Sequence, residues 1–279
     1  MTEAKKIVLG TVQFGCQYGI NSAGRPDTSE VCSILQEAKT SGILTLDTSS
    51  AYGNAEDILG VCLNDDMAFR IVSKYPRGEA SVNQRFEASL QRLKIHSLYG
   101  YLLHHFEVYK VTPEIWSDFV RLRDSGKVKK IGFSLYQPQE LDLLLKNDVD
   151  FNLLQIPYNL FDRKFEPYLK ELHERGVEIH VRSTFLQGLF FKDRNALPEK
   201  LLPLKIYLQQ LDDYSRDSGL TISQLALNYN LQNPYIDGVL IGVDNVKQLR
   251  ENIEAISNVH IDLDFDIEEK ELLNPVNWK

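Results

Sequence analysis

The chain has 279 residues, of which 43% are hydrophobic and 25% charged, and its formal net charge at pH 7 is −8. This length suffices for a large buried core, and the acidic balance argues against nucleic acid or an anionic membrane surface as a partner. No run approaches the ~18 apolar residues of a membrane-spanning helix, and the first residues lack the apolar core of a signal peptide.

Short apolar strands alternate with amphipathic helices along the sequence. Asp27, Thr28 and Glu30 give a typical helix start, and apolar residues then recur at helical spacing. Strands are predicted at residues 7–10, 43–46, 70–73, 101–103, 130–133, 151–155, 177–181 and 239–241. Helices are predicted to begin near residues 28, 54, 81, 112, 138, 165, 199, 222 and 245.

The order of these elements predicts an α/β fold. The strands are continuous apolar runs, as expected when both faces of a sheet are covered. Eight strands, each followed by a helix and with no linker between them, predict a (β/α)8 TIM barrel in one domain over residues 1–279. A doubly wound open sheet is the alternative, but no Gly-x-Gly-x-x-Gly follows any strand.

Polar residues stand at the ends of three consecutive strands. Asp47, Lys74 and His104 follow strands two, three and four, and Tyr52 lies in the loop after Asp47. Each alone has an ordinary explanation, such as a turn, a solvated strand end or a core histidine. Together they favour one pocket, because active sites of such barrels lie at the carboxyl ends of the strands.

These four side chains suit proton transfer to a carbonyl oxygen. A phenol with a pKa of about 10 is a poor acid at neutral pH unless a cation stabilises its phenolate. Lys74 would supply that cation, Asp47 would keep Lys74 in place, and His104 would bind the substrate oxygen or share the proton.

The same residues resemble the aldo-keto reductases. They match that family's catalytic tetrad in order and context: Leu-Asp-Thr-x-x-x-Tyr-Gly at Asp47 and Tyr52, Ser-Lys at Lys74, and Leu-Leu-His at His104. The resemblance runs nearly end to end. It implies reduction of an aldehyde or ketone by hydride from NADPH or NADH, with no metal.

The resemblance also implies a cofactor site and a substrate pocket. Gln155 matches the glutamine that binds the nicotinamide carboxamide, and the helix after residue 245 suits the adenosine phosphates because helix N-termini bind anions. The predicted cofactor residues are Gly10, Thr11, Ser134, Gln155, Arg182, Ser183, Phe185, Gln187, Gly188, Ile241, Gly242, Val243, Asp244, Asn245, Gln248, Glu251 and Asn252. Tyr18, His105 and Phe106, with Phe185 and Phe190, are candidates for lining the substrate pocket, and core packing is the equal alternative.

Three positions depart from the family pattern. Leu135 stands where Asn usually follows Ser134, and Arg182 stands where an aromatic ring often stacks on the nicotinamide. Arg182 would stack on that ring, bind an anionic group, or turn outward to a surface acid. Gln248 replaces the Arg often found near the 2′-phosphate, with Asp244 close by, which predicts a preference between NADPH and NADH of about tenfold or less.

Two other readings stay open. One is a non-catalytic nucleotide-binding subunit of the same fold, and the other is a metal-dependent hydrolase using His104, His105 and Asp47, whose spacing is poor for metal ligands. The three cysteines, Cys16, Cys32 and Cys62, form no Cys-x-x-Cys pair, which predicts reduced thiols in a cytoplasmic protein. The sequence gives no indication of the physiological substrate or the oligomeric state.

Overall fold

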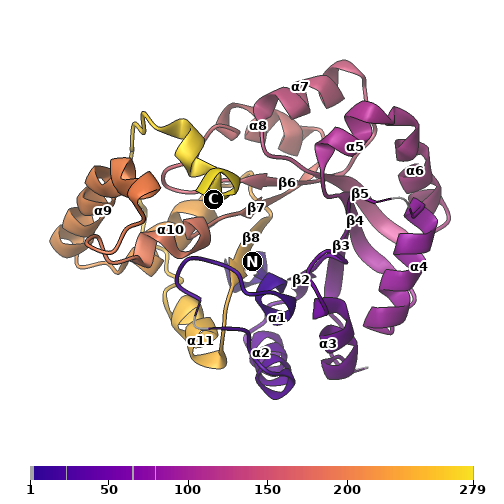
Figure 1. Ribbon diagram of the computed structural model, residues 1–279, viewed down its shortest axis with the longest axis horizontal. Helices are drawn as coiled ribbons and strands as arrows, with labels where there is room; N and C mark the ends of the chain where they lie inside the picture. The colour runs from indigo at the N-terminus through magenta and orange to yellow at the C-terminus, as the bar shows by residue number, and fades with distance from the viewer. Residues whose placement is uncertain (1–2, 23, 65, 79, 279) are drawn as a thin grey trace.

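Eight parallel strands close into a barrel in sequence order, with β1 beside β8 (Figure 1). The computed structural model describes residues 3–278 apart from 23, 65 and 79. The strands are β1 (Ile7–Gly10), β2 (Thr45–Asp47), β3 (Arg70–Tyr75), β4 (Leu98–Leu103), β5 (Val128–Ser134), β6 (Leu153–Pro157), β7 (Glu178–Arg182) and β8 (Gly238–Gly242). The predicted (β/α)8 barrel is confirmed, and the open-sheet alternative is wrong.

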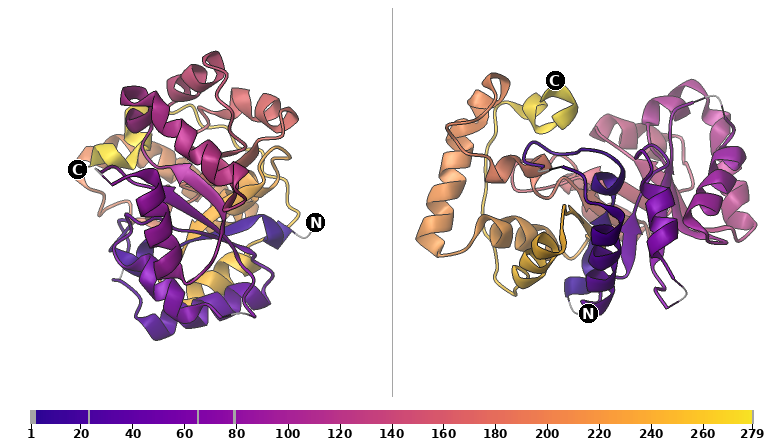
Figure 2. Two further views of the ribbon diagram at one scale, coloured as in Figure 1. Left: turned by 90° about the vertical axis from the view of Figure 1, so that its right-hand side faces the viewer. Right: turned by 60° about the horizontal axis from the view of Figure 1, so that its bottom comes forward.

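Helices surround the barrel, as the views in Figures 1 and 2 show. They are α1 (Val12–Gly15), α2 (Thr28–Thr40), α3 (Ala55–Cys62), α4 (Val82–Leu93), α5 (Phe106–Val111), α6 (Trp116–Asp124), α7 (Pro138–Lys146), α8 (Glu166–Glu174), α9 (Lys205–Ser218), α10 (Ile222–Leu231) and α11 (Val246–Glu254). The capping side chains Asp27, Ser81 and Thr221 accept hydrogen bonds at three of the predicted helix starts. Short 3-10 turns lie at Glu3–Lys6, Pro113–Ile115, Leu186–Phe191, Glu199–Leu204, Lys270–Leu273 and Pro275–Trp278.

Two predicted boundaries differ from the structure. The helix predicted from Thr112 is a 3-10 turn followed by α6, and the sequence pattern missed α5, which is short and has no capping side chain at His105. Lys74 lies within β3, one residue before its end, rather than after it. Lys74 is nevertheless at the carboxyl end of the barrel, because only Tyr75 follows it in β3.

The interior of the barrel is closed by apolar side chains below the polar end. Val72, Leu102 and Leu153 are fully buried and form a cluster of their own. Gly132 lets β5 approach β6 closely, because a Cβ there would overlap the carbonyl group of Leu153. In the resulting register Ser134 lies beside Gln155, which brings two predicted site residues together.

A disulfide joins α2 to α3. Cys32 and Cys62 are bonded, with their Cα atoms 4.9 Å apart, and Cys16 is free. The prediction of reduced thiols was therefore wrong for two of the three cysteines, because their separation of 30 residues gives no local signal of pairing. This bond also removes one ground for predicting a cytoplasmic location. In the described part of the chain, no helix is both long enough and apolar enough to cross a membrane.

Candidate active site

Lys74 lies at the centre of a buried polar cluster at the carboxyl ends of β2 and β3. Its Nζ donates to Asp47 Oδ1 at 2.5 Å and to the Thr48 carbonyl at 2.9 Å, and lies 3.4 Å from Tyr52 Oη. Lys74 is fully buried and Asp47 nearly so. The structure thus brings Asp47, Tyr52 and Lys74 into direct contact, as their positions at neighbouring strand ends predicted.

Burial sets the protonation of this cluster. It raises the pKa of Tyr52 well above its ordinary value, and the Asp47 charge raises it further, while Arg182 acts in the opposite direction. Burial lowers the pKa of Lys74, and Asp47 opposes that shift. The phenol therefore keeps its proton in the resting protein, next to an ion pair whose cation is poised to stabilise a phenolate.

His104 approaches the Tyr52 ring edge-on, with 5.8 Å between the ring centroids. Burial, with a smaller effect of the Lys74 charge, lowers the pKa of His104 to about 2, so the imidazole is neutral at neutral pH. Ser49 Oγ accepts from the Ala51 backbone N–H at 3.1 Å and lies 3.2 Å from His104 Nδ1. The Ser49 hydroxyl keeps a second lone pair beside its O–H, so it can donate to Nδ1 or accept from it, depending on the tautomer of His104.

A cavity of about 470 Å³ extends from Tyr52 and Asp47 to Asn252 at the end of α11. That volume is in the ordinary range for a small-molecule site. Among the predicted residues, those that line it are Gly10, Thr11, Tyr18, Gln155, Arg182, Ser183, Phe185, Gln187, Gly188, Ile241, Gly242, Asp244, Gln248, Glu251 and Asn252.

Other predicted residues lie outside this cavity. Phe106 and Phe190 pack against aromatic rings in the core, which is the alternative that the sequence left open. His105 stacks on His104. Val243 is buried in the core, and Asn245 accepts from the Gln248 N–H as the cap of α11.

Two predicted cofactor residues, Ser134 and Gln155, lie next to each other, and Gln155 also contacts Asp47 of the tetrad. Ser134 Oγ lies 3.5 Å from Gln155 Oε1, and Gln155 Nε2 donates to Asp47 Oδ2 at 2.7 Å. Gln155 thus holds the second oxygen of the carboxylate whose first oxygen binds Lys74. Its second amide N–H and the remaining acceptor capacity of Oε1 are left for a ligand.

Arg182 turns inward at the end of β7. Its guanidinium lies 4.1 Å from the centroid of the Tyr136 ring and donates to the Leu135 carbonyl at 3.0 Å. No acidic side chain in the described residues forms an ion pair with it, so the outward-turned alternative is wrong. Tyr136, which the sequence reading missed, therefore stacks with Arg182 at the tetrad end of the cavity.

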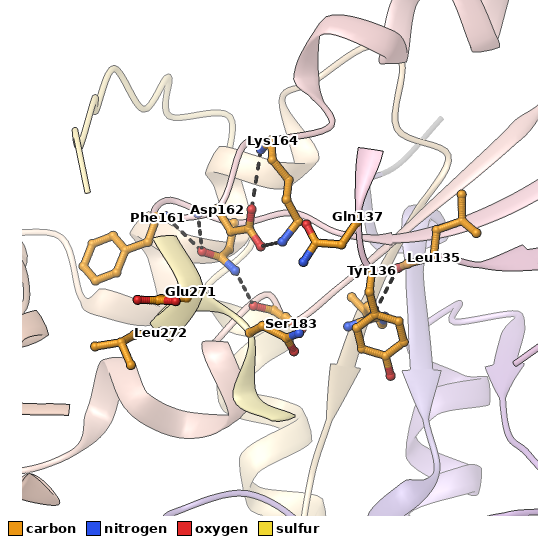
Figure 3. A network of polar contacts seen from close by, with 12 residues as sticks. Leu135, Tyr136, Gln137, Phe161, Asp162, Lys164, Ser183, Glu271 and Leu272 are labelled. Atoms are coloured by element: carbon orange, nitrogen blue, oxygen red, sulfur yellow. Dashed lines mark hydrogen bonds and ion pairs between the residues drawn. The ribbon is translucent and has the colours of Figure 1, made fainter. Parts of the chain in front are cut away.

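The loop after β6 is hydrogen-bonded to the loop after β7, which lines the cavity. Asn159 donates to the Ser183 carbonyl at 3.0 Å and accepts from the backbone N–H groups of Phe161 and Asp162 (Figure 3). Ser183 has a positive φ of 65°, a conformation that non-glycine residues adopt only with support. The Asn159 amide supplies that support.

A second pair of loops meets across the cavity. The Gln187 side chain donates to Tyr18 Oη at 2.8 Å, and the Ile20 N–H donates to the Gln187 carbonyl at 3.0 Å. Asn21 donates to the Gly188 carbonyl at 2.6 Å. The loop after α1 therefore bridges the β7 loop over the cavity.

The side chains near β1 and β8 suit a nucleotide. Gln13 Oε1 is buried without a hydrogen-bond partner, so it offers an acceptor to a ligand. Gly242 makes room for Gln13, because a Cβ at Gly242 would overlap the Gln13 carboxamide. Sequence reasoning missed Gln13 and also Val12, Gly19, Asn21, Ser22, Thr184, Phe191, Ser223 and Leu240, which line the cavity with no local motif to mark them.

Metal ligands are not gathered here. In the described residues no group of three or more His, Cys, Asp or Glu side chains could hold a metal ion. Both Asp47 oxygens are engaged by Lys74 and Gln155, and His104 Nδ1 is engaged by Ser49. The hydrolase alternative therefore has no support in the geometry.

The sequence model of the aldo/keto reductase family matches residues 6–268. The chain belongs to this family. The oxidoreductase YqkF of Bacillus subtilis (strain 168) is 25% identical over 274 residues, which covers 88% of this chain and 87% of YqkF. The L-glyceraldehyde 3-phosphate reductase of Escherichia coli (strain K12) is 27% identical over 271 residues, covering 81% and 78%.

Solved aldo-keto reductases share the fold. The aldo-keto reductase AKR11C1 from Bacillus halodurans (holo form) has a TM-score of 0.72 at 22% identity, covering 96% of this chain and 90% of its own. Membership of the family makes this chain an NAD(P)H-dependent oxidoreductase whose class of reaction is the reduction of carbonyl compounds.

Proposed function

We propose that this aldo-keto reductase reduces an aldehyde or ketone with Tyr52 as the proton donor. The observation that carries the proposal is the half-buried Tyr52 phenol, whose Oη lies 3.4 Å from Lys74 Nζ. The nicotinamide cofactor supplies the hydride when it is bound. Gln13, Gly242 and Asn252 would hold its nucleotide part, and Gln155 and Arg182 would lie at its nicotinamide end.

Each member of the tetrad has one task. Tyr52 delivers its proton to the carbonyl oxygen as negative charge develops there, and Lys74 stabilises the resulting phenolate. Asp47 holds Lys74 in place and balances its charge. We infer that neutral His104 carries its proton on Nε2 and directs it to the substrate oxygen, with the Ser49 hydroxyl donating to Nδ1.

The substrate class stays broad. The name of the Escherichia coli relative shows that one member of the family reduces a phosphorylated aldehyde. For this chain a small carbonyl compound is the proposed substrate, and Tyr18 at the cavity rim is the proposed lining residue. The proposed cofactor is NADH or NADPH, for which the sequence alone predicted a difference of about tenfold or less, and a cytoplasmic location stays a prediction.

Substitution of Tyr52 by Phe tests the proposal. Tyr52→Phe keeps the ring and removes the acid, so turnover of a generic aldehyde should fall by at least the roughly 10²–10⁴-fold typical of a general acid. Lys74→Met should be similarly damaging, because it removes the charge that stabilises the phenolate. Cofactor binding, measured by fluorescence titration, should persist in Tyr52→Phe.

Tyr101→Phe is the matched control. Tyr101 is fully buried on β4, and its hydroxyl has no hydrogen-bond partner, so its loss should leave turnover unchanged. Full activity in Tyr52→Phe would remove Tyr52 from the mechanism. Dinucleotide binding by the wild-type protein without turnover of any carbonyl compound would instead favour a non-catalytic nucleotide-binding subunit.

A further inference from the structure

The N-terminus of α11 lies at the end of the cavity farthest from the tetrad. Gln248 and Glu251 of this helix and Asp244 just before it line the cavity there. If the dinucleotide binds as proposed, with its nicotinamide near Arg182, its adenosine lies at this end. Free backbone N–H groups at a helix N-terminus favour anions, so their partners decide whether a phosphate is accepted.

Side chains of the protein already bind two of these N–H groups. The Val246 N–H donates to Glu30 Oε1 at 2.7 Å, and the Gln248 N–H donates to Asn245 Oδ1 at 2.9 Å. Just before the helix, the Asp244 N–H donates to Gln248 Oε1 at 2.7 Å. The one charged group bound to the N-terminus of α11 is thus a carboxylate of the protein itself.

Glu30 comes from α2, 216 residues away in the sequence. Figures 1 and 2 show α2 beside α11. The backbone of Glu30 lies in the first turn of α2, where the Glu30 N–H donates to the capping Asp27 side chain at 2.9 Å. The Glu30 carboxylate is half-buried, so a ligand would have to displace it to reach the Val246 N–H.

The cations of this segment pair with acidic side chains of the protein. Lys247 is 84% exposed and lies 3.6 Å from Glu251, and Arg250 pairs with Glu37 of α2 at 2.7 Å. Among the described residues that line the cavity, Arg182 is the only cation, and its charge acts on Tyr52 at the other end. Among the described lining residues, no cation therefore lies on α11 to pair with a phosphate.

We propose that Glu30 makes this enzyme select NADH against NADPH. A 2′-phosphate carries a charge of about −1.5 to −2 and would meet the Glu30 and Glu251 carboxylates, while the N-terminus of α11 already binds Glu30. The 2′-hydroxyl of NADH is neutral and can donate to a carboxylate, as it does in other NAD sites. The inference rests on the proposed function for the placement of the dinucleotide, and it predicts a larger preference than the sequence did.

Dissociation constants for NADH and NADPH, measured by fluorescence titration without substrate, test the inference. In the wild-type protein NADPH should bind more than about tenfold more weakly than NADH. Glu30→Gln retains an oxygen for the Val246 N–H and removes the charge. It should tighten NADPH by about tenfold and change the affinity for NADH by less than about threefold.

Glu254→Gln is the matched control, because it removes the same charge at the opposite end of α11 and should change neither affinity.

A comparison of AMP with adenosine 2′,5′-bisphosphate on the wild-type protein needs no variant, and AMP should bind more tightly. Equal binding of the two dinucleotides by the wild type, or an equal shift of both in Glu30→Gln, would overturn the role of Glu30. Binding of neither would overturn the proposed function, and this inference with it.

Discussion

At the scale of single residues, we expect Ser49 to set which nitrogen of His104 carries the proton, because its hydroxyl lies 3.2 Å from Nδ1. The Ala51 N–H uses one of the two lone pairs of that hydroxyl, and the proposed donation from His104 Nε2 to the substrate requires the hydroxyl to donate to Nδ1. Ser49→Ala would release this constraint and let His104 adopt either tautomer. We expect kcat/KM for carbonyl reduction to fall about tenfold, which corresponds to the loss of one buried hydrogen bond of about 1.4 kcal/mol.

A purely structural role of Ser49 would not move the protonation of the ring, so ¹⁵N NMR of His104 provides the second readout. Wild-type His104 should show a protonated Nε2, and Ser49→Ala a mixture of tautomers. The pKa of His104, about 2 in the folded protein, lies below the ordinary value of about 6.5, so the ring stays neutral from pH 5 to 8. A wild-type pH–rate profile that breaks near 6.5, or an unchanged tautomer in the variant, would contradict this role.

The sequence predicted that Asp47, Tyr52, Lys74 and His104 lie together because they follow consecutive strands, and strand ends of a parallel barrel lie side by side. It could not identify partners that depend on loop paths or on packing between distant helices. Tyr136 stacks on Arg182 because the β5 loop turns back over β7, and Glu30 reaches Val246 because α2 packs on α11. Gln155 was correctly placed at the site, but its bond to Asp47 needs the β2 and β6 ends to face each other across the barrel.

At the scale of elements, the disulfide between α2 and α3 is expected to stabilise the fold by constraining the unfolded chain. It closes a loop with a sequence separation of 30, for which the chain-entropy relation gives about 3–4 kcal/mol. Cys32→Ser/Cys62→Ser should lower the free energy of unfolding in urea by about that amount. Reductant should destabilise the wild type similarly.

The double variant is also the control for this experiment, because reductant should have no further effect on it. Cys16→Ser should leave the response of the wild type to reductant intact, since Cys16 takes no part in the bond. Identical denaturation curves for the wild type in the presence and absence of reductant would show that the two thiols are not joined in solution.

Element positions were predictable where a cap and a periodic apolar face agree. Helix α4 begins after Ser81 and α7 begins at Pro138, as predicted. By contrast, α5 has neither a capping side chain nor enough length for a periodic pattern, and only its packing against the barrel fixes it. Strand ends moved by one to three residues because pairing with neighbouring strands, which the sequence does not display, extends β3 and β5.

At the scale of the whole molecule, the barrel has polar clusters at both ends and an apolar layer between them. The second cluster lies at the amino ends of the strands, where Glu178 of β7 accepts from Tyr99 of β4 at 2.6 Å and from His180 at 2.8 Å. Lys130 of β5 is 2.8 Å from the same carboxylate. Gly238 of β8 makes room for the His180 ring, because a Cβ there would overlap it. Glu178 thus joins strands that are not neighbours in the sheet.

This cluster should contribute to the stability of the whole barrel and not to catalysis. Burial would raise the pKa of Glu178, but His180, Lys130 and Tyr99 outweigh it and hold that pKa well below its usual range. Because the folded pKa is depressed, the contribution is present above the unfolded value of about 4.3 and is lost as pH falls toward the folded value. Glu178→Gln should therefore lower the free energy of unfolding by on the order of 3 kcal/mol at pH 7.

Urea unfolding of wild type and Glu178→Gln across pH 3–7 measures this contribution, and the difference between them should shrink below about pH 4. Glu171→Gln, which removes an exposed partner of Arg175, is the control and should cost less than about 1 kcal/mol. Carbonyl reduction by folded Glu178→Gln should equal that of the wild type, because the apolar layer of Val72, Leu102 and Leu153 separates the two ends. A loss of turnover without a loss of stability would mean that the lower cluster acts on the active site through the barrel.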